Sequence, residues 1–369
     1  MGPSLEVTKE GILVFRIGQL GDTIVSIPTI DAIRKRHPRA PLFLLTDQHP
    51  VKRGFISSWD ILGSTGWFDD VVYYQVSQGS IFEQAQTMSH LVFRLRRLRL
   101  GLVYDLSPFR NSLQLVRDRF FFQDLVGIPK LRRPAPCLPP SQGHGVTKMP
   151  VEPEWRRLLG VVPNPPTTRF HFVVPETSRM EAASALATDG IGDKMRLIAI
   201  APGSKMPAKR WPIERFAQAG KRLLAAYPDL LLAILGGGED SEIGNQLCNE
   251  WGERSRNLAG KLSVYGSAAV LERCVAYLGN DTGTMHLAAM VGVPCIAIFS
   301  ARDFPGKWEP YGDHHIILRR DIECARCMLE VCSEKGNECL MRIDVQEVFS
   351  AGQRVLEGGD LRERKAETP

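Results

Sequence analysis

The sequence predicts an α/β protein built from two Rossmann-like domains. Three observations lead to this prediction. Each half alternates strand-like apolar runs with segments of helical periodicity, glycine turns separate the two, and a proline-rich stretch lies between the halves. Strand–helix alternation is typical of parallel sheets covered by helices. Ligands bind such sheets at the carboxyl ends of the strands, so we expect the two domains to face a central cleft.

The first half begins with an apolar run, Ile12 to Ile17, that predicts a strand. A turn with Gly18 and Gly21 follows. Isoleucines then recur at helical spacing, at Ile24, Ile27, Ile30 and Ile33. Further strands are predicted at 41–46, 69–76 and 101–107, and a helix at 81–98, whose apolar residues share one face.

The second half repeats the alternation. Strands are predicted in 196–204, 230–240, 275–281 and 293–300, and helices at 213–227 and 283–291. Between the halves, Pro134 to Pro166 is dense in proline and predicts extended surface chain. We therefore expect an N-terminal domain at 1–170, a C-terminal domain at 171–345, and a C-terminal helix and polar tail at 346–369.

Composition indicates an ordinary globular protein, since 44% of the 369 residues are apolar and 24% are charged. No apolar run approaches the roughly 18 residues that span a membrane. The first ten residues lack the apolar core of a signal peptide. We expect a soluble cytoplasmic protein whose 8 cysteines are reduced or metal-bound.

A basic band extends from Leu91 to Arg133. Ten basic residues lie there, opposed by Asp105, Asp118 and Asp124 alone. One interpretation is a solvated helix face. The other is a surface for an anionic partner such as a phosphorylated glycan, lipid head groups or nucleic acid.

Asp22 is out of place in a phosphate-binding turn. The dinucleotide fingerprint is G-x-G-x-x-G, whereas this turn reads G-x-x-G-D. A helix N-terminus attracts anions, so a carboxylate there would oppose a bound phosphate. Asp22 is therefore either a helix cap or a catalytic group.

Polar residues gather at several strand ends of the second half. Ser204, Lys205 and Lys209 precede one helix, and lysines beside free backbone N–H groups suit an anion. Glu239 follows three glycines after the next strand, where a carboxylate usually binds a ribose. Asp281, Thr282, Gly283 and His286 open another helix, whose N-terminus suits a diphosphate. Together these residues predict a nucleotide site.

These motifs resemble glycosyltransferase family 9, the heptosyltransferases. The resemblance covers 12 to about 348 and is carried by three stretches, "RIGQLGDTIVSIPTIDAIRKRHP", "PGSKMPAKRWPIERFA" and "GNDTGTMHLAAMVGVPCIAIF". It is weakest over 75–166. The family implies the GT-B fold, with the donor on the C-terminal domain and the acceptor on the N-terminal one. It also implies sugar transfer, typically of heptose from ADP-heptose, onto a lipopolysaccharide core.

The resemblance assigns a role to each candidate. Asp22 matches the proposed catalytic base, which takes the acceptor hydroxyl proton in an inverting transfer. Lys209 would hold the diphosphate, with Ser204 and Lys205 beside it, and Glu239 would bind the ribose. Thr282, Gly283 and His286 match the phosphate-contacting motif, and Asp281 matches its acidic member near the donor sugar. The family requires no metal or other cofactor for catalysis.

Two features near the C-terminus carry weaker expectations. The cysteines Cys324, Cys327, Cys332 and Cys339 could close a structural zinc site, or could be four reduced thiols. Trp308, in a loop beside the expected donor site, is either a stacking surface for a base or sugar or a packing residue.

Three functions fit these observations. The first is an inverting glycosyltransferase acting on lipopolysaccharide or a related anionic glycan, or on a secondary-metabolite glycoside, with peripheral contact to the inner membrane. The second is a nucleotide-sugar enzyme of the same architecture, such as an epimerase. The third is a nucleic-acid protein using the basic band, and the absence of a recognisable nucleic-acid motif argues against it.

Overall fold

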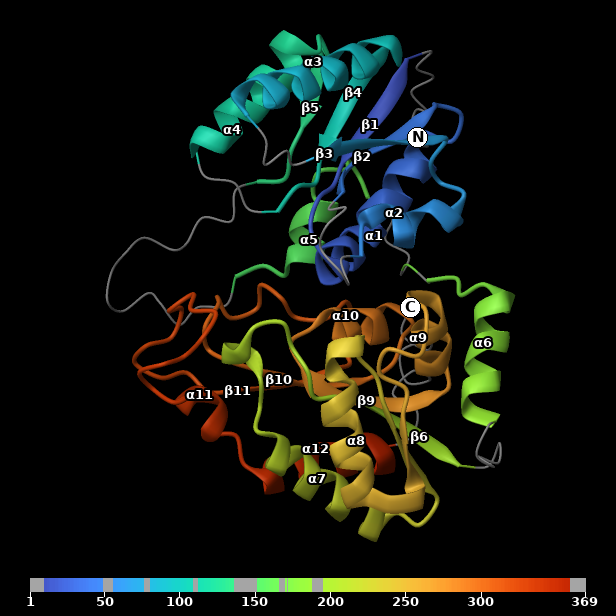
Figure 1. Ribbon diagram of the computed structural model, residues 1–369, viewed down its shortest axis with the longest axis vertical. Coiled ribbons are helices and arrows are strands. Elements are labelled where there is room, and N and C mark those ends of the chain that lie inside the picture. The colour runs from blue at the N-terminus through green and yellow to red at the C-terminus, as the bar shows by residue number, and fades with distance from the viewer. Residues whose placement is uncertain are drawn as a thin grey trace. The chain divides into compact units, whose positions relative to one another are not determined.

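The computed structural model describes residues 10–48, 56–75, 80–108, 112–135, 151–165, 170, 172–187 and 195–358. The chain divides into two compact units. Unit 1 comprises 1–139 and 154–170, and unit 2 comprises 140–153 and 171–369. Each contains a parallel sheet with helices on both faces (Figure 1). The two Rossmann-like domains predicted from strand–helix alternation are thus confirmed.

Unit 1 has a five-stranded sheet of order β3-β2-β1-β4-β5. Its elements are β1 (Gly11–Phe15), α1 (Leu20–Arg36), β2 (Leu42–Gln48), α2 (Ser58–Leu62), η1 (Gly63–Thr65), β3 (Asp70–Gln75), α3 (Ile81–Arg97), β4 (Leu100–Asp105), α4 (Ser112–Arg119), the π-helix η2 (Phe120–Leu125), β5 (Lys130–Arg132) and α5 (Glu154–Leu159). Helices α1, α2 and α5 lie on one face of the sheet, and α3 and α4 lie on the other (Figure 1).

Unit 2 has a six-stranded sheet of order β11-β10-β9-β6-β7-β8. Its elements are α6 (Glu176–Ala187), β6 (Arg196–Ala201), η3 (Pro207–Lys209), α7 (Ile213–Ala226), β7 (Leu230–Ile234), η4 (Gly238–Asp240), α8 (Ser241–Trp251), η5 (Gly252–Arg254), β8 (Ser255–Asn257), α9 (Val264–Glu272), β9 (Cys274–Asn280), α10 (Gly283–Met290), β10 (Cys295–Phe299), β11 (Ile316–Arg319), α11 (Glu338–Met341) and α12 (Val345–Glu357). A buried core joins the sheet to α7, α8 and α12.

Each sheet has one point where the strand order reverses. In unit 1 the reversal lies between β1 and β4, and in unit 2 between β6 and β9. At both reversals the register shifts once, between Gly11 and Ile12 in unit 1 and between Leu197 and Ile198 in unit 2, and the pairing is regular after that point. Crevices at such reversals, outside the carboxyl ends of the strands, are where doubly wound sheets bind ligands.

The interpretation of 134–166 as extended surface chain is wrong in one part. Glu154–Leu159 forms α5, which packs against α1 and buries Glu154 and Leu158. The prolines frame this short helix rather than exclude it, because Pro153 stands directly before its first turn, where the missing N–H costs nothing. Residues 136–150 lie outside the described part of the chain.

Candidate active site

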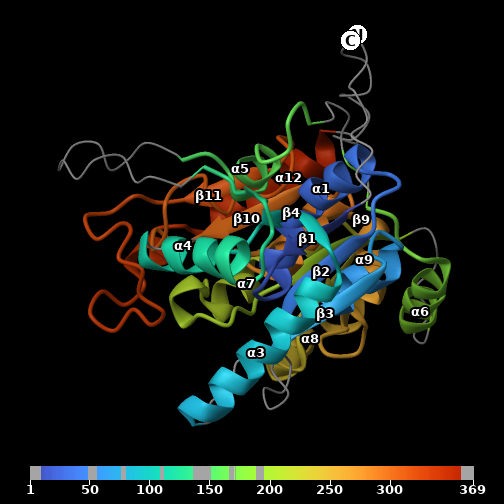
Figure 2. The ribbon, with the colours of Figure 1, turned by 90° about the horizontal axis from the view of Figure 1, so that it is seen from above.

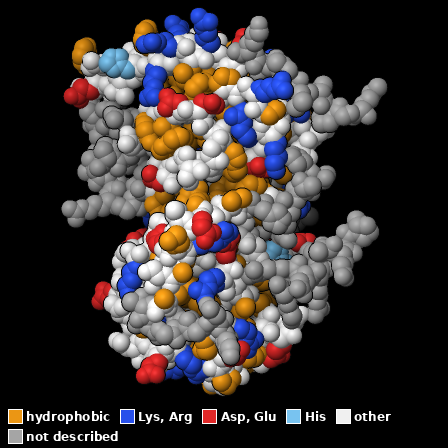
Figure 3. All heavy atoms as spheres, turned by 90° about the vertical axis from the view of Figure 1, so that its right-hand side faces the viewer, with side chains coloured by type: hydrophobic (Ala, Val, Ile, Leu, Met, Phe, Trp, Pro, Cys, Tyr) orange, Lys and Arg blue, Asp and Glu red, His pale blue; other side chains and the backbone are white. Residues whose placement is uncertain are grey.

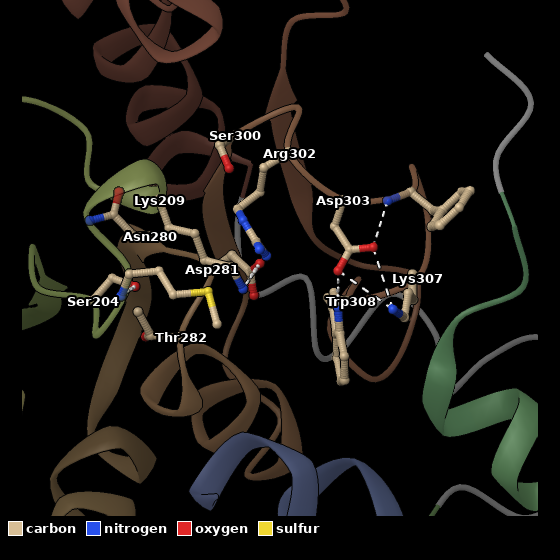
Figure 4. Close-up of polar contacts among 12 residues, drawn as sticks. Ser204, Lys209, Asn280, Asp281, Thr282, Ser300, Arg302, Asp303, Lys307 and Trp308 are labelled. Carbon is tan, nitrogen blue, oxygen red and sulfur yellow. Dashed lines mark hydrogen bonds and ion pairs between the residues drawn. The ribbon is translucent and has the colours of Figure 1, made fainter. Parts of the chain in front are cut away.

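The predicted donor residues of unit 2 meet at the strand reversal between β6 and β9. Lys209 lies on η3 after β6, and Asp281 follows β9 directly. Lys209 Nζ is 2.6 Å from Asp281 Oδ2, and both side chains are largely buried (Figure 4). Ser204 and Thr282 lie next to each other on one side of this pair. The sequence prediction named these four residues, and the fold brings them together.

Asn280 fixes the loop that carries Lys209. Its fully buried side chain donates from Nδ2 to the Pro202 carbonyl at 2.7 Å and accepts from the Trp211 N–H at 3.1 Å. One amide at the end of β9 therefore holds both ends of the loop after β6. Sequence analysis quoted Asn280 within a motif but gave it no role.

The N-terminus of α10 points its first turn at this site. Thr282 is the N-cap in an extended conformation, and its side chain makes no capping hydrogen bond. Its hydroxyl is 3.4 Å from that of Tyr277 instead. The first N–H groups of the helix therefore have no side-chain cap, which suits an anion. His286, one turn further on, is buried, and its ring meets that of Trp308 edge-on at 6.3 Å.

The loop after β7 touches the loop after β6. A Cβ on Gly203 would lie 1.9 Å from Asp240 Oδ1, so any larger residue there would displace the Asp240 carboxylate. Asp240 accepts from the Gly237 N–H at 3.0 Å, and burial raises its pKa. Glu239 and Lys205, both predicted donor contacts, are exposed on these loops.

A fourth loop, after β10, carries Trp308 and adds Asp303 and Lys307, to which sequence analysis gave no role. The Asp303 carboxylate accepts from the Phe304 N–H and from Trp308 Nε1, both at 2.8 Å, and Lys307 Nζ lies 3.4 Å away (Figure 4). Burial opposes the charge of Asp303, but Lys307 and these donors hold its pKa below the ordinary value. Trp308 is thus fixed through its ring nitrogen. Sequence analysis did not predict this contact with Asp303.

Backbone carbonyls of the cysteine-rich segment brace two of these loops. Arg302 donates to the Leu329 carbonyl at 2.6 Å and to the Met328 carbonyl at 2.8 Å. The Ala208 N–H donates to the Glu330 carbonyl at 2.9 Å. The loop bearing Lys209 and the loop bearing Asp303 are therefore both anchored to residues 328–330.

Asp22 lies at the strand reversal of unit 1. It is the third residue of α1, not its cap, because the N-cap is Gln19. Asp22 Oδ2 accepts from the Gln19 N–H at 3.0 Å in a capping box, a contact that fixes the carboxylate orientation. Gly18 has φ +123°, and a Cβ there would lie 2.8 Å from the Asp22 carboxylate. The turn is therefore shaped around this side chain.

The buried side chain of Arg16 stabilises the same turn. Its side chain is fully buried and donates to the carbonyls of Leu106 and Asp22, while Nη2 lies 3.8 Å from Asp22 Oδ1. Burial lowers the Arg16 pKa, an effect that the carboxylates of Asp22, Glu154 and Asp105 oppose. Sequence analysis missed Arg16, although a charged residue ending an apolar run was a signal.

The zinc prediction gains no support. Cys324, Cys327, Cys332 and Cys339 are all free thiols, and Cys327 is exposed. Burial raises the pKa of Cys339, and the neighbouring Cys324 and Cys332 add to the effect. In the described part of the chain, no group of three or more His, Cys, Asp or Glu residues is arranged to hold a metal ion.

A cavity of about 220 Å³ lies elsewhere in unit 2, between α7 and α8. Glu214, Lys221 and Glu250 line it, and it contains none of the predicted site residues. We therefore place the candidate site at the strand ends. Among the described residues, no helix is long and apolar enough to cross a membrane.

Comparison with known proteins supports the family resemblance. The model of glycosyltransferase family 9 (heptosyltransferase) matches residues 165–337, a little under half of the chain. Lipooligosaccharide heptosyltransferase 2 of Campylobacter jejuni is 25% identical over 171 residues, which are 45% of this chain and 53% of that protein. The chain thus matches about half or less of the length of such relatives.

Solved structures are similar over nearly the whole chain. A family 9 glycosyl transferase from Veillonella parvula gives a TM-score of 0.72 at 19% identity, covering 95% of this chain and 98% of that one. ADP-heptose LPS heptosyltransferase II of Escherichia coli gives 0.65 at 19% identity, covering 94% and 99%. These findings confirm the predicted GT-B fold and the resemblance to family 9.

We predict that Arg16→Lys destabilises the protein. Lysine keeps the charge but has no fork with which to reach the Leu106 and Asp22 carbonyls together. Loss of such contacts should lower the free energy of unfolding by about 1–3 kcal/mol, measured by urea denaturation. Arg39→Lys, at an exposed position after the same helix, is the control. Equal stability of the two variants would contradict the bracing role of Arg16.

Proposed function

We propose that this chain, similar to glycosyltransferase family 9, is an inverting glycosyltransferase that moves heptose from ADP-heptose to a lipopolysaccharide core or related glycan. The observation that carries the proposal is the meeting of Lys209, Asp281 and the α10 N-terminus at one strand reversal. A cation beside free helix amides suits a diphosphate. Heptose and adenine are suggested by the names of the similar proteins.

On the donor side, we propose that Lys209 and the first N–H groups of α10 receive the diphosphate. Lys209 is paired with Asp281 at 2.6 Å, so Asp281 orients the ammonium group before the donor arrives. Asp281 would then lie next to the donor sugar. Glu239 is exposed at the neighbouring strand end, where its carboxylate can accept from a ribose hydroxyl.

On the acceptor side, we propose that Asp22 is the general base. The acceptor oxygen attacks the anomeric carbon while the bond from that carbon to the diphosphate breaks. Its proton passes to Asp22, and ADP leaves with the bonding electrons. The capping box fixes Asp22 Oδ2 on the Gln19 N–H, and Oδ1, which lies 3.8 Å from Arg16 Nη2, would take the proton.

We propose that transfer needs no metal ion, because Lys209 and the α10 amides stabilise the negative charge that the leaving diphosphate gains.

The acceptor proposed here is an anionic glycolipid at the cytoplasmic face of the inner membrane. Only some residues of the basic band, Leu91 to Arg133, would bind this acceptor, because others already have partners within unit 1. Arg96 and Arg133, for example, bind the carbonyl of Leu125 and the carboxylate of Asp105, and Arg110 lies outside the described residues.

Incubation with ADP-heptose, with and without a heptose-deficient lipopolysaccharide acceptor, tests the proposal. A transferase gives a heptosylated acceptor and one ADP per sugar transferred. Without the acceptor it releases little ADP. A nucleotide-sugar epimerase would alter the donor without any acceptor. Conversion of the donor at the same rate with and without the acceptor would overturn the assignment as a transferase.

We expect Lys209→Ala to weaken donor binding. Charge-assisted contacts contribute about 1.5–3 kcal/mol, so the Kd for ADP should rise roughly tenfold to a hundredfold by calorimetry. The variant also leaves the Asp281 carboxylate unpaired beside the diphosphate, which adds repulsion. Lys221→Ala, which removes an exposed lysine paired with Glu250 on α8, is the control. Unaltered ADP affinity would remove Lys209 from the donor site.

Asp22→Asn should abolish most turnover and keep the fold. Asparagine can accept from the Gln19 N–H as aspartate does, but it cannot take a proton. We expect kcat to fall by about 10²–10⁴ with normal thermal unfolding and ADP affinity. Asp31→Asn, on the same helix and paired with Lys35, is the control. A well-folded Asp22→Asn protein with near-parental kcat would mean that Asp22 serves only the capping box.

A further inference from the structure

One surface of unit 1 exposes large apolar side chains on two neighbouring elements. We call it the α3–α4 surface and define it by its apolar and basic members. The apolar members are Ile81, Phe82, Met88, Phe93, Leu113, Val116 and Phe120. The basic members are Arg94, Arg96, Arg97, Arg117 and Arg119. Figure 3 views unit 1 from the side away from α4, and in the upper part of that view hydrophobic and basic side chains lie next to one another.

Helix α3 leaves the body of unit 1 at its N-terminal end. Leu91 and Leu95 are buried against the sheet, whereas Ile81 and Phe82 are 87% and 80% exposed. Figure 2 shows this half of the helix extending beyond the strands. The start is nevertheless well defined, because Ser80 and Glu83 form a capping box. An ordered helix end thus presents apolar side chains to solvent, where they gain nothing from folding.

Helix α4 and the first residue of η2 carry a second apolar stripe. Leu113, Val116 and Phe120 follow one another at i, i+3 and i+7, and all three are exposed, Leu113 to 81%. This spacing places them on one side of the helix. The buried residues of the same segment, Asp118 and Phe122, face inward.

The two elements are held together on one face of the sheet. Arg96 on α3 donates from Nε and Nη2 to the Leu125 carbonyl at the end of η2, at 3.0 and 2.6 Å. Leu91 and Phe122 belong to one buried core cluster. The C-terminal half of α3 is therefore held against η2, and both elements lie on one face of the sheet.

The charge of this patch is positive. Its elements hold five arginines and three acidic residues, of which Glu83 is engaged in its cap and Asp118 is buried beside Arg117. The Arg97 guanidinium lies over the Phe93 ring at 5.8 Å, so cation and apolar surface are combined. Apolar side chains surrounded by arginines are what an anionic lipid interface binds.

We propose that the α3–α4 surface docks on a bilayer with anionic head groups. Ile81, Phe82, Leu113 and Phe120 enter the head-group boundary, and Arg97 and Arg119 contact lipid phosphates, whereas Arg94, Arg96 and Arg117 are engaged by Asp70, Leu125 and Asp118. A projecting helix end without a complementary groove fits a fluid interface better than a protein partner. The inference rests on the proposed function only in that an acceptor anchored in lipid would be presented to unit 1. Lipid binding is measured without donor or acceptor, so either can fail alone.

The test uses the full chain and flotation with vesicles. Vesicles of phosphatidylcholine containing phosphatidylglycerol should bind the protein, and pure phosphatidylcholine vesicles should bind it much less. The paired substitution Ile81→Ser with Phe82→Ser should lower the partition coefficient by tenfold or more, and so should Leu113→Ser with Phe120→Ser. The matched control pairs Val173→Ser with Met180→Ser, which change apolar side chains of unit 2 that are 80% and 67% exposed.

A second measurement locates the contact and does not depend on loss of binding. Relative to the parent protein with its six tryptophans, the fluorescence added by Phe82→Trp should be quenched by vesicles with brominated acyl chains, whereas that added by Met180→Trp should not. Equal quenching at both positions, or equal flotation of the serine variants and their control, would overturn the proposal. So would light scattering that shows a dimer of the parent protein converted to monomer by the serine variants, because a second copy would then cover the surface.

Discussion

The donor-side geometry of unit 2 depends on one buried amide. Asn280 ends β9 and holds the loop after β6 at both Pro202 and Trp211. Because a buried amide that loses its partners costs free energy, the two strand ends can separate only at a penalty. This constraint keeps Lys209 beside Asp281, and it explains how a loop rather than a rigid element can hold a cation in place at the strand ends.

Unit 1 uses a different device for the same purpose. Arg16 is buried under the turn after β1, and two carbonyls and nearby carboxylates compensate its charge. Gly18 lets the backbone close over Asp22. In each unit a buried side chain, Arg16 or Asn280, therefore stabilises the turn at the strand reversal, and its partners are mainly backbone groups.

The sequence predicted most of the fold because parallel strands buried on both sides are continuous apolar runs. It erred at α5, where proline content outweighed a short apolar pattern around Leu158. For the site, strand ends and glycine turns identified Lys209 and Asp281. Asn280 and Arg16 were not predictable, because their partners are carbonyls distant in sequence, which no local pattern records. The pairing of Asp303 with Trp308 was hidden for a similar reason.

The anchoring of the site loops to residues 328–330 has a consequence for how this segment tolerates change. All three anchors are backbone carbonyls, whereas the side chains of Met328, Leu329 and Glu330 are exposed. At Leu329 and Glu330 almost any side chain leaves the carbonyl where it is, whereas Met328, at φ +58°, has a left-handed backbone that disfavours β-branched residues. Sequence divergence at these positions is therefore compatible with an unchanged site. Deletion or proline insertion moves the backbone itself, and these are the changes that would displace the loop carrying Lys209.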